Sequence, residues 1–275
     1  MIRLFWLLML AFIPLRIYAQ TNDSLLTLAE NALFKKNFLE AIQYFQKYIG
    51  KNPNEANAFI GIGVAYLELK NYDSAYYYFN LAVNIEPNNA IALTSRASVL
   101  ILFGDYNNSY KDLIKSLKLD STNINTYTTL ATYYFLTNNI QKAYNTLERA
   151  LIINPKSIDI YLSRAALNMQ NDKFIEALSD VNKVLELDTN NVKALYGRGT
   201  IYKYLKEYDK AMIDYEKALT LEPNNGEIYV RRGILYLEMG EYQKAVEDME
   251  YGYKLNPDLK FQTENFYKEA LDKLK

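Results

Sequence analysis

The sequence predicts an all-α fold in which seven helix–turn–helix units stack as an α-solenoid and a final helix caps the stack. Proline recurs at spacings of 34 residues or twice that, at Pro53, Pro87, Pro155, Pro223 and Pro257. Within each 34-residue unit, apolar residues recur at helical spacing. Only 10 glycines and 6 prolines interrupt 275 residues, which leaves room for long helices. A repeat of this length is typical of stacked helical hairpins.

The prolines set the boundaries of the units. With proline at position 32, seven units follow without insertion or deletion: 22–55, 56–89, 90–123, 124–157, 158–191, 192–225 and 226–259. Ser121 and Thr189 occupy position 32 in the two units that lack proline there. Each helix would be marginal alone in water, so stability must come from the stacking of neighbouring units.

Two positions of the unit hold only small residues. Position 8 is Ala29, Gly63, Ala97, Ala131, Ala165, Gly199 and Gly233, and position 20 is Ala41, Ala75, Ser109, Ala143, Ala177, Ala211 and Ala245. Small residues at these positions let the two helices of a unit approach closely. We expect the turn between them at positions 14–16, where Gly104 and Gly240 suit the end of a helix. Between units, Asn89 and Asn225 are expected to cap the next helix.

These residues closely resemble the tetratricopeptide repeat (TPR) family, over residues 22–259. The sixth unit carries the family's small, large and proline positions throughout: Gly199, Tyr202, Ala211, Tyr215, Ala218 and Pro223. The resemblance implies a right-handed, curved stack with the first helix of each unit on the concave side. Departures from the pattern fall at position 11 (Ala32, Asn168) and position 27 (Tyr48, Val184, Gly252), where we expect less regular packing.

The two ends of the stack differ. Residues 260–275 are predicted to form a capping helix, with its apolar residues available to cover the last unit: Phe261, Phe266, Tyr267, Ala270 and Leu274. No equivalent helix precedes the first unit within residues 20–275. Leu25, Leu26, Leu33 and Phe34 are therefore expected to be partly exposed.

Arginine and aspartate vary together between units. Position 7 is arginine and position 23 is aspartate in the same four units, which gives the pairs Arg96 and Asp112, Arg164 and Asp180, Arg198 and Asp214, and Arg232 and Asp248. The other three units have neither charge at these positions. We predict a salt bridge between the two helices of each such unit. The alternative is a row of arginines that binds anions, but a partly buried arginine is normally paired.

Residues 1–19 have the layout of a secretory signal peptide. Arg3 precedes an apolar run from Leu4 to Ile13, and Ala19 offers a small residue for cleavage before Gln20. The alternative is a retained membrane anchor, but the run is shorter than the roughly 20 residues that a spanning helix needs. Export to a periplasm or out of the cell is expected. Removal of Arg3 and Arg16 would leave 29 basic and 32 acidic residues, a net charge of −3.

The composition excludes several classes of function. Without cysteine and histidine, the chain has no thiolate nucleophile, no imidazole base and no Cys or His metal ligand. The full chain has a net charge of −1, which is no basic footprint for nucleic acid. The pairs Gly61/Gly63 and Gly197/Gly199 fall within helices and are interpreted as packing residues rather than phosphate loops. We expect no enzyme, no cofactor and no metal.

The concave surface implied by the family resemblance is the candidate binding groove. Positions 5, 9, 12 and 13 of its central units give Thr94, Ser98, Thr128, Thr132, Leu162, Ala166, Tyr196, Thr200, Lys203 and Tyr204. The groove is therefore small, hydroxylated and nearly uncharged in the middle, with a more contoured end at the tyrosines. Exposed serines and threonines can equally have no specific ligand.

The family's carboxylate clamp for chaperone tails needs a set of Lys, Asn and Arg on three consecutive units. Only Lys193 and Arg231 match it, so no binding of chaperone tails is expected. We expect a scaffold that binds a protein or peptide partner in an exported compartment. The alternative is self-assembly as a homodimer through the uncapped first unit. A carboxylate or Ser-Lys hydrolase has little support, and the related RNA-reading repeats have a period of 35.

Overall fold

The computed structural model describes residues 24–275, and all regular structure in this range is helical. The described chain divides into two compact units, residues 24–155 and residues 156–275. The predicted signal peptide, residues 1–19, lies outside the described residues. None of the helices within residues 24–275 combines the length and the apolar character needed to cross a bilayer.

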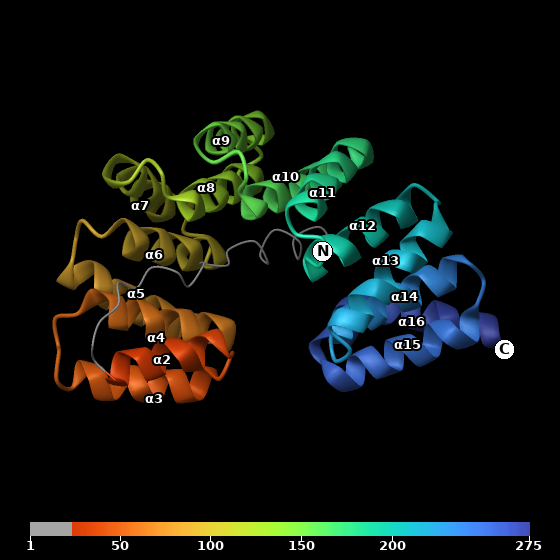
Figure 1. Cartoon of the computed structure of the whole chain (residues 1–275), viewed down its shortest axis with the longest axis horizontal. Coiled ribbons are helices and arrows are strands. Elements are labelled where there is room, and N and C mark those ends of the chain that lie inside the picture. Colours follow the sequence, from red (N-terminus) through yellow and green to blue (C-terminus); the bar gives the residue numbers. More distant parts are fainter. Residues whose placement is uncertain (1–23) are drawn as a thin grey trace. The chain divides into compact units, whose positions relative to one another are not determined.

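The amino-terminal unit contains four helical hairpins, whose helices are labelled in Figure 1. Their helices are α2 (Ser24–Phe34), α3 (Phe38–Ile49), α4 (Ala56–Glu68), α5 (Tyr72–Ile85), α6 (Ala90–Leu102), α7 (Tyr106–Leu119), α8 (Ile124–Leu136) and α9 (Ile140–Ile153). The main contacts join helices that are consecutive or next but one in sequence, such as α4 with α6. The hairpins match the first four predicted repeats.

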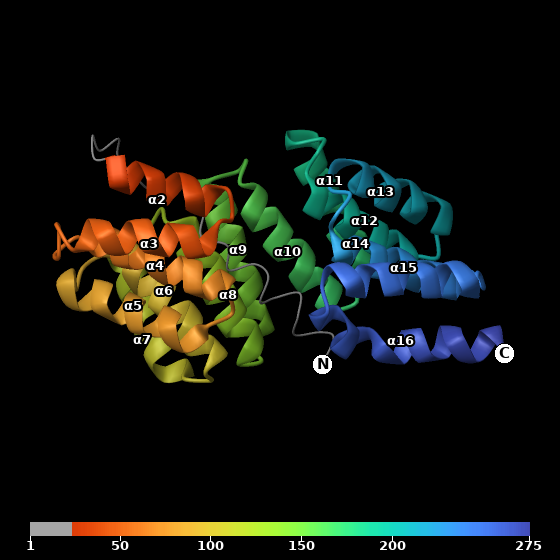
Figure 2. The same cartoon turned by 90° about the horizontal axis from the view of Figure 1, so that it is seen from below.

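The carboxy-terminal unit contains three hairpins and the capping helix. Its helices are α10 (Ile158–Gln170), α11 (Phe174–Leu187), α12 (Val192–Tyr204), α13 (Tyr208–Leu221), α14 (Gly226–Glu238), α15 (Tyr242–Leu255) and α16 (Asp258–Leu274). Helix α16 lies beside α15 and also contacts α14 (Figure 2). It thus occupies the place that the first helix of another repeat would take.

Every turn within a hairpin has the same backbone geometry. Position 15 has a positive φ in all seven repeats, at Lys36, Lys70, Gly104, Asn138, Asp172, Lys206 and Gly240. In each repeat the amide of position 16 donates to the carbonyl of position 11, as Asn71 does to Tyr66 at 2.9 Å. This left-handed residue followed by a six-to-one hydrogen bond is a Schellman-type helix end. The predicted turn at positions 14–16 is confirmed.

Asparagine caps the amino end of the first helix in several repeats, as the sequence predicted. The side chains of Asn89 and Asn225 each accept a hydrogen bond from an amide in the first turn of the following helix. Asn123 and Asn191 do the same where proline is absent from the preceding turn. The sequences 120–123 and 188–191 therefore form the same junction with different capping residues.

The small residues at positions 8 and 20 are buried in all seven repeats. A β-carbon added at Gly63 would lie 2.5 Å from the ring of Phe79, so the close approach requires glycine there. Ser109, the one hydroxyl among these positions, donates to the carbonyl of Ala97 at 3.0 Å. The packing prediction is confirmed at both positions.

The expected exposure of the chain ends is only partly correct. Leu26 and Leu33 are buried, because the apolar face of α2 packs against α3 and α4. Phe34, in contrast, is 77% exposed. At the other end, Ala270 is buried and Phe266 and Tyr267 pack against the last hairpin. Phe261 is 89% exposed and Leu274 is also exposed, so these two residues do not cover the last repeat.

All four predicted arginine–aspartate salt bridges are present. Each guanidinium makes two or three hydrogen bonds to the carboxylate of its own repeat; in the sixth repeat, Arg198 Nε and Nη2 both lie 2.8 Å from Asp214. Asn168 departs from the family pattern because its amide donates to Asp180 at 3.1 Å. Asn168 is therefore a third member of the Arg164–Asp180 contact.

Two of these arginines also reach the preceding repeat. Arg96 Nη1 donates to Asn80 at 2.9 Å, and Arg198 Nη1 donates to Asn182 at 2.9 Å. Both asparagines are position 25 of the repeat before. These partly buried bonds join one hairpin to the next, whereas the arginine–aspartate pairs join only the two helices of one hairpin.

Candidate functional site

The predicted groove residues of the amino-terminal unit are buried hydroxyls. Thr94 Oγ1 lies 2.9 Å from Ser116 Oγ and 2.7 Å from Thr126 Oγ1, so it forms a hydroxyl cluster where α6, α7 and α8 meet. Ser98, Thr128 and Thr132 donate to carbonyls of their own helices. These bonds satisfy the hydroxyls without a ligand, and their side chains add little to the accessible surface.

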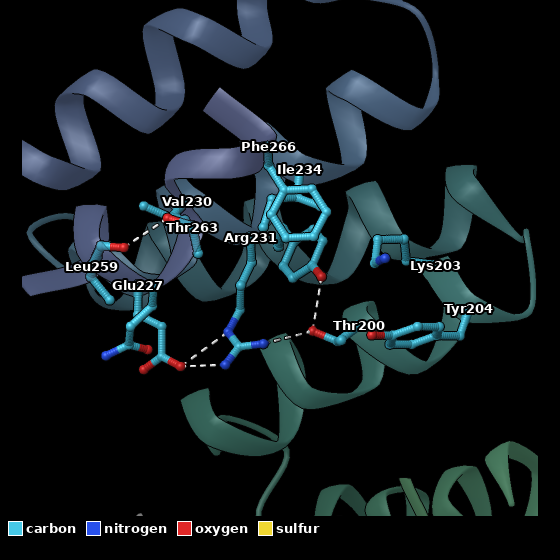
Figure 3. A pocket seen from close by; sticks show the side chains of 12 residues that line it. Thr200, Lys203, Tyr204, Glu227, Val230, Arg231, Ile234, Leu259, Thr263 and Phe266 are labelled. Carbon is cyan, nitrogen blue, oxygen red and sulfur yellow. Dashed lines mark hydrogen bonds and ion pairs between the residues drawn. The ribbon is translucent and has the colours of Figure 1, made fainter. Parts of the chain in front are cut away.

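The predicted residues of the carboxy-terminal unit behave differently. Leu162 and Ala166 pack on or near the core of that unit. Four others, Tyr196, Thr200, Lys203 and Tyr204, follow one another along α12. The last three line a cavity of about 120 Å³ between α12, α14 and α16. We take this cavity as the candidate site (Figure 3).

The cavity draws its walls from four helices. Its lining consists of Thr200, Lys203, Tyr204, Tyr215, Glu227, Val230, Arg231, Ile234, Leu259, Gln262, Thr263 and Phe266. Because α16 supplies the last four of these, the site requires the capping helix as well as two repeats.

Arg231 is the centre of the polar wall. Its guanidinium forms an ion pair with Glu227 one helical turn earlier, and its Nη1 donates to Thr200 at 3.4 Å. Figure 3 shows the guanidinium between these two partners. The ring of Tyr196 lies beneath it, with the centroid 5.3 Å from Cζ. This cation–π contact and the ion pair hold the arginine in one position.

Two buried tyrosines support the polar wall: Tyr215 lines the cavity and Tyr196 lies behind it against Arg231. Thr200 donates to the Tyr196 carbonyl at 2.9 Å, so its contact with Tyr215, also at 2.9 Å, has the tyrosine as donor. Burial raises the pKa of Tyr215 to about 12, and burial together with the charge of Glu227 raises the pKa of Tyr196. For Arg231, burial is the largest effect and lowers the pKa, but the charge and hydrogen bond of Glu227 together with the two tyrosines more than offset it, so the pKa is raised. Both phenols stay neutral and the guanidinium stays charged.

Lys203 and Tyr204 form one edge of the cavity. Lys203 Nζ lies 2.6 Å from Glu238 and 4.2 Å from the centroid of the Tyr204 ring. Tyr204 also stacks on Phe174 with the two rings nearly parallel at 5.0 Å, yet remains 49% exposed. It therefore presents a fixed aromatic surface to solvent.

The remaining wall is apolar. Val230 and Ile234 contribute it from α14, and Leu259 and Phe266 from α16. Sequence reasoning did not place these residues in the site, and it treated Arg231 only as a single match to the carboxylate clamp. The signal was available, because positions 2, 5, 6 and 9 of the seventh repeat are Glu227, Val230, Arg231 and Ile234.

The charged groups of the cavity are paired within the protein. Its arginine and lysine are each held by a carboxylate, and the hydroxyls of Thr200 and Tyr215 are hydrogen-bonded to one another. Over residues 24–275 no group of three or more acidic side chains could hold a metal ion. The cavity thus consists of an apolar recess beside a rigid polar wall.

Known proteins match this repeat pattern and fold. Tetratricopeptide repeat profiles match residues 26–92, 192–225 and 214–247. No curated protein matches the sequence. A TPR protein from Parabacteroides merdae ATCC 43184 has 19% identity and a TM-score of 0.67, with 90% of this chain and 97% of that chain covered.

Two other solved structures have the same fold. Yeast Tom70 has 17% identity and a TM-score of 0.69, with 98% of this chain and 70% of that chain covered. PilF of Pseudomonas aeruginosa has 20% identity and a TM-score of 0.56, with 81% and 99% covered. Identities this low establish a shared fold alone. The profile matches in both units and the seven in-phase hairpins show that the chain is built of tetratricopeptide repeats.

Proposed function

We propose that the protein is a non-catalytic scaffold that binds a segment of a partner protein along the first helices of its repeats. The TPR fold is a protein-interaction fold, so the partners of this chain are proteins. The observation that carries the finer proposal is the cavity between α12, α14 and α16, with the half-exposed Tyr204 at its edge. A recess flanked by a rigid aromatic ring is a common anchor point at protein interfaces.

Selection of peptides from a random phage-displayed library on immobilised chain 20–275 tests this function. We expect peptides to be enriched on the wild-type chain and to lose binding on Ile234→Trp, which fills the cavity. Ile213→Trp is the matched control because Ile213 is exposed on α13 and does not line the cavity. Enriched peptides that bind both variants equally would exclude this cavity as the binding site.

A second candidate function is self-association through the first repeat. It is favoured by one observation: Phe34 and Leu39 are 77% and 67% exposed in the α2–α3 hairpin. Because Leu26 and Leu33 are buried within the hairpins, the apolar surface available to a second copy is smaller than the sequence suggested.

We also propose that the protein acts outside the cytoplasm. The charge and apolar pattern of residues 1–19 supports export. Mass spectrometry of the protein isolated from its native cells should find Gln20 as the first residue. A chain that still begins at Met1 and stays in the cytoplasm would contradict export.

A further inference from the structure

We infer that the cavity between α12, α14 and α16 takes one uncharged aliphatic side chain, of about the size of leucine, from the bound partner segment. This inference rests on the proposed scaffold function and adds the chemistry of its ligand. It depends on three properties of the cavity: its volume, the pairing of its charges and the placement of its apolar wall.

The volume sets the size of the group. The cavity measures about 120 Å³, and an apolar cavity of about 150 Å³ in another protein is known to hold benzene. A branched aliphatic side chain is therefore close to the largest group that fits. An indole would require Phe266 or Ile234 to move.

The charges of the wall balance. Arg231 is paired with Glu227, and Lys203 is paired with Glu238. An acidic ligand group would have to displace a carboxylate from one of these cations, and a basic ligand group would have to displace a cation from one of these carboxylates. Displacement leaves one charge of the pair without its partner, and for the mostly buried Arg231–Glu227 pair this weakens binding strongly. A neutral group causes no such loss.

The apolar wall supplies the favourable contacts. Val230 and Ile234 lie one helical turn apart on α14, and Leu259 and Phe266 face them from α16. An aliphatic side chain that enters between these helices would be covered from both sides. Gln262 is exposed at the rim, where its amide can hydrogen-bond with the backbone of the ligand segment.

Methyl NMR of the chain 20–275, labelled at isoleucine, leucine and valine, tests the inference. The probes are capped five-residue peptides that differ only in a central Leu, Asp, Lys or Trp. We expect the leucine peptide to shift the methyl signals of Val230, Ile234 and Leu259, and each charged peptide to bind at least tenfold more weakly. The tryptophan peptide should also bind more weakly. Ile234→Trp should abolish the leucine shifts and Ile213→Trp should not.

The outcomes separate the inference from the function on which it rests. Equal or tighter binding of a charged or tryptophan peptide, or leucine shifts confined to other methyls, would overturn the inference, and so would no shift with any peptide at millimolar concentration. If phage-selected peptides nevertheless bind the chain, the scaffold function stands and only the chemistry of the pocket is wrong. If the selection also yields nothing, the proposed function fails as well.

Discussion

At the scale of single residues, the arginine–aspartate pairs are expected to contribute most to stability. Sequence reasoning could find them because position 7 and position 23 change together, and the structure places each pair in bidentate contact. It could not find the bonds from Arg96 to Asn80 and from Arg198 to Asn182, since these cross from one repeat to the next. The aspartates are more deeply buried than the arginines. Removal of the aspartate and removal of the arginine are therefore expected to lower the free energy of unfolding by different amounts.

We expect Asp214→Ala to lower the free energy of unfolding by about 3 kcal/mol. Asp214 is 4% exposed and Arg198 is 26% exposed, so the guanidinium left behind keeps some contact with water, which places the cost at the lower end of the range for buried pairs. Urea unfolding followed by circular dichroism measures the change. Glu186→Ala, which breaks an exposed pair with Lys183, is the control and should cost about 0–1 kcal/mol. Equal effects of the two substitutions would contradict a buried pair.

The turn residue at position 15 is a second place where a single residue affects stability. Lys206 has a φ of 60°, a left-handed conformation that costs a non-glycine residue about 1–2 kcal/mol. Lys206→Gly should therefore stabilise the protein by up to about 1 kcal/mol, since the added flexibility of glycine in the unfolded chain offsets part of the gain. The reciprocal change Gly240→Ala, at a φ of 81°, should destabilise it. A shift of the two melting temperatures in the same direction would refute the strain argument.

At the scale of helices, stability depends on how closely the two helices of a hairpin approach. Gly252 departs from the family pattern, and the sequence suggested irregular packing there. The structure shows the opposite, since a β-carbon at Gly252 would lie 2.7 Å from the carbonyl oxygen of Gly226 and 2.6 Å from Val230. Helices α14 and α15 therefore pack backbone against backbone at this point.

Two glycine substitutions distinguish close packing from helix propensity. Gly252→Ala should lower the free energy of unfolding by about 1–3 kcal/mol, because the added methyl group forces α14 and α15 apart. Gly197→Ala, in the middle of α12 with nothing within 4 Å of the new atom, should raise it by about 0.5–1 kcal/mol. Thermal unfolding followed by circular dichroism gives both values. If Gly252→Ala is also stabilising, the two helices are not in close contact at Gly252.

At the scale of the whole molecule, the sequence predicted the fold far better than the site. A strict 34-residue period fixes which residues are buried in each hairpin, so the helices, turns and caps follow from it. The period does not show that Thr94 meets Ser116 and Thr126, because that contact joins three helices. Nor does it place Phe266, since this part of α16 follows the last repeat. The cavity was therefore missed even though three of its residues, Thr200, Lys203 and Tyr204, were predicted.

Light scattering of the chain 20–275 tests self-association at this scale. We expect a mass of one chain, and the same mass for a variant with Phe34→Glu and Leu39→Glu, because most apolar side chains of α2 are already buried by α3 and α4. A wild-type dimer that the two substitutions convert to a monomer would favour the homodimer alternative. Changing Leu26 instead would be uninformative, since a charge at that buried site would disrupt the hairpin.

The arginines that reach back to the preceding hairpin have a consequence for how this chain can be rearranged. Asn80, Arg96 and Asp112 have the same connections as Asn182, Arg198 and Asp214, and the two sets lie 102 residues apart, three full periods. Residues 56–123 and 158–225 are thus matched cassettes of two hairpins each. Duplication or exchange of a whole cassette preserves its internal bonds, whereas a recombination point at residue 90 or 192 removes the asparagine from its arginine. A segment of two consecutive hairpins is therefore the smallest unit that evolution or engineering can exchange in this chain without breaking these bonds.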